Sequence, residues 1–140
     1  MNVFISHTTG DKDIAIAVAT ELQKHGVSVW SDERSLSPGQ DWAATTKSVM
    51  ESSDAIIAIL SKHSFSSSWV RSELEQALFN EKFKGKFLPV MIGGESEDLS
   101  RLPWVLSKIN HLRLSAKESR SALSKKIVRE FLNLINDKGA

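Results

Sequence analysis

Trp69 and Glu73 are the residues of this sequence whose types and spacing best suit chemistry. They are four positions apart, so on a helix their side chains share one face. The helix that would carry them follows an apolar run at 55–60, which is typical of a buried strand. A carboxylate beside an indole, at the mouth of an α/β sheet, can bind a planar cation and polarise or attack the sugar attached to it. We therefore take Glu73 as a candidate catalytic residue.

The elements that must position these two side chains follow from the hydrophobic pattern. Short apolar runs predict five strands, at 2–6, 27–30, 54–60, 87–92 and 109–114. Helices are predicted between and after them, at 14–25, 42–50, 69–83 and 123–134. This alternation predicts an α/β fold, a flavodoxin-like doubly wound five-stranded parallel sheet with helices on both faces. Pro89 counts against a fully paired central strand, and sparse pairing or a bulge beside it would accommodate it.

The predicted topology also indicates where a ligand would bind. In such sheets, ligands lie beyond the carboxyl ends of the strands, where the strand order reverses. With the order 2-1-3-4-5, that crevice lies between the first and third strands and is bordered by loops 6–11 and 61–68. The fold therefore places Glu73 beside Ser6 and His7, and Lys12 belongs to the same first loop.

Three segments together make the chain resemble a TIR (Toll/interleukin-1 receptor) domain of the bacterial NAD⁺-consuming type. They are the first strand with Ser6 and His7, the Pro38-Gly39 turn that leads to Trp42, and the run 66–74. The resemblance covers nearly the whole chain, so we expect a single domain at 2–136 and a flexible tail at 137–140.

The resemblance implies roles for individual residues. Glu73 would be the catalytic carboxylate. The expected substrate-binding residues are Ser6, His7, Lys12, Trp30 and Trp69. The loop after the second strand resembles the family's BB loop, which covers the site in some states and contacts a neighbouring domain in others. Its expected functional residues are Arg34, Leu36, Pro38 and Gly39.

The reaction that the resemblance implies is cleavage of the nicotinamide–ribose bond of NAD⁺, which is a substrate here and not a cofactor. Nicotinamide leaves as a neutral group from a cationic glycoside, so one carboxylate can suffice where ordinary glycosidases need two. Glu73 would hold the ribose hydroxyls and stabilise an oxocarbenium-like transition state. Water or another nucleophile, including the adenine base, would then attack C1. The chain would thus be an NAD⁺ nucleosidase of the hydrolase or cyclase type, and its product and its preference for NAD⁺ over NADP⁺ stay open at this point.

Composition excludes several other classes of function. The net charge of +1 gives no electrostatic reason to expect nucleic acid or an anionic membrane as partner. The chain has no cysteine, no signal-peptide pattern and no apolar run near the roughly 20 residues of a membrane helix, which fits a cytoplasmic protein. The four histidines lack the spacing of metal ligands, so we expect no metal.

Particular residues bear on three alternative functions. The loop 7–12 resembles the phosphate loop of flavodoxins but departs from it at His7 and Lys12. A phosphoacceptor receiver would need an aspartate at the end of the third strand, where this chain has Ser61. The third alternative is a non-catalytic TIR scaffold that acts by homotypic contact, and the presence of Glu73 favours the enzyme over it.

The family resemblance also implies a setting for the activity. We expect activation by assembly with other TIR domains, as a homo-oligomer or filament, in bacterial immune or stress signalling such as antiphage defence. A separate sensor or effector protein is a possible partner.

Overall fold

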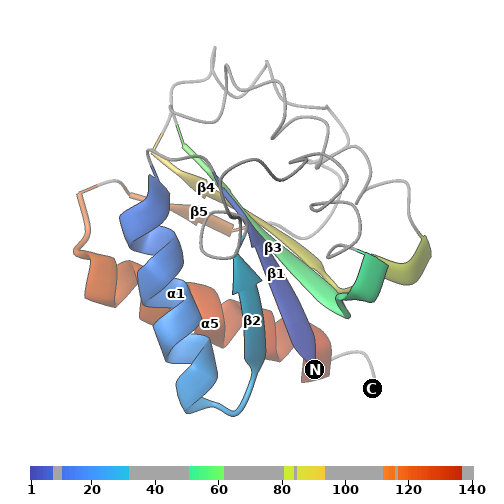
Figure 1. The fold of residues 1–140 in the computed structure, drawn as a ribbon. Helices are drawn as coiled ribbons and strands as arrows, with labels where there is room; N and C mark the ends of the chain where they lie inside the picture. The colour runs from blue at the N-terminus through green and yellow to red at the C-terminus, as the bar shows by residue number, and fades with distance from the viewer. Residues whose placement is uncertain are drawn as a thin grey trace, which may run out of the picture.

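A computed structural model describes residues 1–7, 11–31, 51–61, 81–83, 85–93, 112–115 and 117–136. Five parallel strands form one sheet in the order β2-β1-β3-β4-β5 (Figure 1). The strands are β1 (Asn2–Ser6), β2 (Ser28–Ser31), β3 (Ala55–Leu60), β4 (Phe87–Ile92) and β5 (Leu112–Leu114). This is the predicted flavodoxin-like order, and it confirms that the strand order reverses between β1 and β3.

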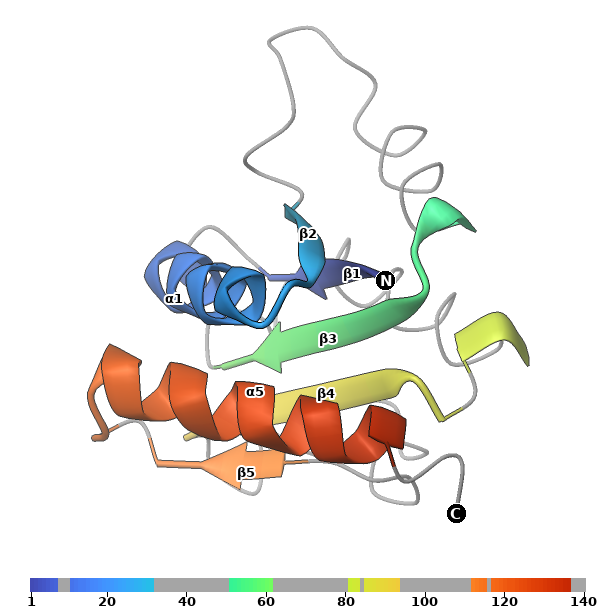
Figure 2. The same ribbon diagram turned by 90° about the horizontal axis from the view of Figure 1, so that it is seen from below.

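Two helices, α1 (Lys12–Lys24) and α5 (Arg120–Asn136), lie side by side on one face of this sheet (Figure 2). A short 3₁₀ turn, Glu81–Phe83, precedes β4. The helix predicted at 42–50, and most of the one predicted at 69–83, lie outside the described residues. None of the helices that the structure describes is both long and apolar enough to cross a membrane.

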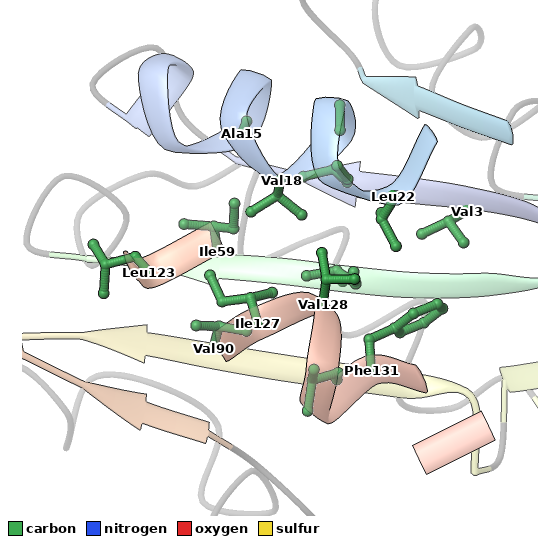
Figure 3. Close-up of a cluster of buried hydrophobic side chains, with 14 of the residues drawn as sticks. Val3, Ala15, Val18, Leu22, Ile59, Val90, Leu123, Ile127, Val128 and Phe131 are labelled. Atoms are coloured by element: carbon green, nitrogen blue, oxygen red, sulfur yellow. The ribbon is translucent and has the colours of Figure 1, made fainter. Parts of the chain in front are cut away.

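A hydrophobic core lies between the sheet and these two helices. The helices contribute side chains three or four residues apart, and the strands contribute every second side chain. Figure 3 shows Val18 of α1 and Ile127 of α5 directed toward Ile59 and Val90 of the sheet. All four are fully buried, as is Phe131, one turn further along α5. Val18 and Leu22 of α1 and Leu123, Ile127 and Phe131 of α5 therefore confirm the predicted buried stripes. His25, which the same spacing placed on the stripe of the first helix, is exposed because it lies at the end of α1, beyond the contact with the sheet.

The central strands are buried on both faces. All six side chains of β3 and all six of β4 are buried, which explains why the two segments are apolar without alternation. Pro89 lies opposite Ala58 of β3, and in the part of the chain that the structure describes β5 is paired with the next three residues of β4, Val90 to Ile92. Pro89 therefore belongs to a paired strand, and no described residue of β5 is paired with it at the position of its missing N–H.

The turn that ends α1 is a Schellman motif. The Gly26 N–H donates to the Gln23 carbonyl at 3.1 Å, and the Val27 N–H donates to the Leu22 carbonyl at 3.2 Å. Gly26 has a φ of 77°, in the left-handed region that residues with a Cβ avoid. This geometry confirms the predicted glycine cap and turns the chain directly into β2.

Replacing Gly26 tests this cap. Apart from the adjacent residues, no heavy atom lies within 4 Å of a Cβ built at position 26, so the cost of Gly26→Ala comes from the backbone conformation. We expect Gly26→Ala to lower the free energy of unfolding by about 1 kcal/mol, and Gly26→Asn to cost less because asparagine tolerates this conformation better. Urea unfolding of the three proteins measures both changes, and equal losses for alanine and asparagine would contradict the conformational explanation.

Candidate functional site

The carboxyl ends of β1 and β3 lie next to each other and form the edge where a ligand site is expected. Ser6 is the last residue of β1 and pairs in register with Ala58 of β3. Ser6 is 2% exposed and His7, directly after it, is 1% exposed. Both predicted residues therefore lie at the edge of the sheet where the topology leads us to expect a ligand, and both are buried there.

A buried hydrogen bond joins the two loops at this edge. The hydroxyl of Ser61, the residue after β3, lies 2.8 Å and 2.7 Å from the two carboxylate oxygens of Asp11 and donates to them. Asp11 immediately precedes α1 and is 3% exposed, and Ser61 is 6% exposed. A hydroxyl carries one hydrogen, so this donation is shared between the two oxygens.

Asp11 and Ser61 were not among the predicted site residues, although both lie in the loops expected to border the crevice. Asp11 carried one usable signal, because aspartate directly before a helical stripe is typical of an N-cap. That signal predicts a hydrogen bond within the first turn of the same helix. A bond to a residue 50 positions away is visible only once β1 and β3 are paired.

Lys12 and Trp30 have surroundings different from those of Ser6 and His7. Lys12 is exposed at the first position of α1. Trp30 is half-buried in β2, and its ring centroid lies 5.2 Å from that of Phe4. Trp30 also borders a hollow of about 260 Å³ near the amino ends of β1 and β3, lined by Asn2, Ser28, Val29, Trp30, Ser52 and Ser53. The roles of Lys12 and Trp30 in substrate binding stay predictions.

The other predicted site residues lie outside the described part of the chain. They are Glu73 and Trp69, and the BB-type loop residues Arg34, Leu36, Pro38 and Gly39. Their roles stay predictions from the sequence. Among the described residues, no group of three or more histidine, aspartate or glutamate side chains is placed to hold a metal ion.

The strand order is that of the predicted fold, and comparison with known proteins decides the family. The family model of the TIR domain matches residues 3–128. The chain belongs to the TIR domain family. The match includes four complete strands, β1 except Asn2, all of α1 and the first half of α5, so the carboxyl ends of β1 and β3 belong to the TIR domain.

Two curated relatives of this TIR domain are archaeal. The chain is 30% identical over 131 residues to the NAD(+) hydrolase TcpA of Theionarchaea archaeon (strain DG-70-1), a match that covers 91% of this chain and 39% of the relative. It is 25% identical over 137 residues to the probable 2′ cyclic ADP-D-ribose synthase TcpO of Methanobrevibacter olleyae, covering 97% and 39%. The chain thus spans about two fifths of the length of these relatives.

A solved structure with a similar fold is the TIR domain of the Toll-related receptor TRR-2 of Hydra magnipapillata. The two structures superpose with a TM-score of 0.70 at 19% sequence identity, covering 96% of this chain and 95% of the other. At this identity the comparison shows the fold alone, and it agrees with the five-stranded parallel sheet described above.

Proposed function

We propose that this TIR domain cleaves the nicotinamide–ribose bond of NAD⁺. The observation that carries the proposal is the similarity, over 91% of the chain, to a relative named as an NAD⁺ hydrolase. A second relative is named as a cyclic ADP-ribose synthase. ADP-ribose and its cyclic forms both arise from NAD⁺ by loss of nicotinamide, so departure of nicotinamide is the step that both names have in common.

The proposed chemistry assigns the central role to Glu73. Nicotinamide departs with the electron pair of the glycosidic bond and becomes neutral, while positive charge develops on C1 and the ring oxygen of the ribose. The carboxylate of Glu73 stabilises that charge and accepts hydrogen bonds from the ribose hydroxyls. Trp69 and Trp30 are the proposed aromatic walls. Ser6, His7 and Lys12 are the proposed polar contacts at the crevice edge.

The second half of the reaction decides the product. If water attacks C1, it loses a proton and ADP-ribose forms. If a nucleophile within the ADP-ribose part attacks, a cyclic product forms that is lighter by one water. The names of the two relatives cover both outcomes, and we propose the activity at the level of nicotinamide release.

We also propose that the activity depends on assembly with other TIR domains, as a homo-oligomer or filament, and serves bacterial immune or stress signalling in the cytoplasm. Support comes from the resemblance of the BB-type loop and from family membership. In this proposal a sensor or effector protein supplies the trigger.

Incubation with NAD⁺ tests the proposed function. Purified protein at high concentration with a crowding agent is expected to release free nicotinamide, and mass analysis of the remaining fragment separates ADP-ribose from a cyclic form. The rate per molecule is expected to rise with protein concentration if assembly activates the domain. Folded protein that releases no nicotinamide at any concentration, crowded or not, would overturn the enzyme and favour a TIR scaffold.

A further inference from the structure

The buried bond between Asp11 and Ser61 has an unusual place in the fold. An aspartate that precedes a helix ordinarily accepts a hydrogen bond from an N–H of the first helical turn. Asp11 makes no such side-chain bond to α1. Its two carboxylate oxygens instead lie within hydrogen-bond distance of the Ser61 hydroxyl at the end of β3. The Asp11 carboxylate therefore does not cap α1 but links the start of α1 to the end of β3, at the point where the strand order reverses. We call this hydrogen bond the tie.

This tie connects two segments of the chain that both contain proposed site residues. On one side, Asp11 ends the loop that begins with Ser6 and His7. On the other side, Ser61 is the first residue after β3 and begins the sequence segment that leads to Trp69 and Glu73. The Asp11–Ser61 bond therefore fixes the departure point of the Glu73 segment relative to the carboxyl end of β1.

Burial strengthens the bond as a geometric restraint. Asp11 and Ser61 are both nearly inaccessible to solvent, so water competes poorly for either partner. A charge-assisted hydrogen bond in such surroundings is shorter and stronger than a neutral one. Loss of the hydroxyl would remove this donor from the buried carboxylate, and a buried acceptor that loses a hydrogen-bond donor raises the free energy of the folded state.

The geometry points to Asp11 and Ser61 as positioning residues for cleavage of NAD⁺: the bond between them holds Ser61, from which the sequence runs on to Glu73, against Asp11 at the start of α1. Neither residue touches the reacting atoms in this assignment. The inference rests on the proposed function, because what is positioned is the proposed catalytic carboxylate.

Kinetics of three variants test the positioning role. Ser61→Ala removes the donor, Ser61→Thr keeps a hydroxyl, and Ser124→Ala is the matched control. Ser124 is also a buried serine, 4% exposed, but its hydroxyl donates to the Ser121 carbonyl within α5 at 3.0 Å. For Ser61→Ala we expect kcat to fall about ten- to a hundredfold, the usual cost of misplacing a catalytic group, with KM changed less than about threefold. Ser61→Thr is expected to recover most of kcat, and Ser124→Ala to keep it.

Two kinetic results would overturn the inference. One is a wild-type kcat for folded Ser61→Ala, which would make the bond purely structural. The other is an equal loss of kcat in Ser61→Ala and Ser124→Ala, which would indicate general loosening of the fold. If Ser61→Thr does not fold, Asp11→Asn provides the second conservative change, because its amide oxygen still accepts from Ser61 while its charge is lost.

Hydrogen exchange separates failure of this inference from failure of the proposed function. If the wild type releases no nicotinamide, the proposed function fails, but exchange of peptides covering 61–73 still reports on the tie. Faster exchange there in Ser61→Ala than in wild type and Ser124→Ala would show that the bond holds this segment. Equal exchange in all three proteins would overturn the tie whether or not the domain is an enzyme.

Discussion

Glu73→Gln is expected to lower the rate of nicotinamide release by about a hundred- to a thousandfold while leaving the fold intact. Glutamine has nearly the shape of glutamate and still hydrogen-bonds to a ribose hydroxyl. It lacks the negative charge that the oxocarbenium-like transition state requires, and loss of one such preorganised electrostatic contact has an effect of this size. Because the lost interaction forms mainly in the transition state, kcat is expected to fall far more than KM rises.

Glu130→Gln is the matched control for Glu73→Gln. Glu130 is exposed on α5, and Glu130→Gln removes the same charge from the protein as Glu73→Gln does. Nicotinamide release is measured for wild type and both variants after their circular dichroism spectra have been matched. Unchanged nicotinamide release by Glu73→Gln would contradict the proposed role of Glu73. Equally slower release by both variants would indicate an effect of the protein's net charge and not of a particular site.

Phe131→Ala is expected to lower the free energy of unfolding by about 3–5 kcal/mol, the usual cost of removing a fully buried phenylalanine. Phe131 is 0% exposed and belongs to the cluster that joins α5 to the sheet (Figure 3). Its deletion leaves a cavity in a core shared by α1, α5 and the sheet, so the whole sheet loses support. A domain of this size has a total stability of about 5–15 kcal/mol, so the variant is expected to lose a large fraction of it.

The control for Phe131→Ala is Asn133→Ala, an exposed position two residues further along α5, where we expect a change within about 0.5 kcal/mol. Urea unfolding measures both variants. Phe131 lies beyond residue 128, where the match to the TIR family model ends. Wild-type stability of Phe131→Ala would show that the last part of α5 is dispensable, and would contradict a single domain that extends to residue 136.

Much of the fold could be predicted from the sequence because its signals are local. Val18 and Leu22 are one turn apart on α1, and both are buried as their spacing predicted. The unbroken apolar run in β3 predicted a strand covered on both faces. Gly26 marked the end of α1 because only glycine adopts its positive φ at no cost. Each of these features depends on a repeat length or a backbone preference within a few residues.

The site was predicted only in part. Ser6 and His7 were placed at the correct edge because strand order alone decides where β1 ends relative to β3. Glu73 and Trp69 were chosen from their spacing and the family resemblance, and they remain predictions because they lie outside the described residues.

The sequence by itself thus determined the order of the elements, the faces that α1 and α5 bury and the edge where chemistry is expected. Only the tertiary structure decided which side chains meet across the sheet. Trp30 packs on Phe4 because the parallel register of β1 and β2 sets them opposite each other. Asp11 bonds to Ser61 and not to its own helix because pairing of β1 with β3 brings the two loops together. No local pattern encodes such a partner, since its choice depends on the register of strands that are far apart in the chain.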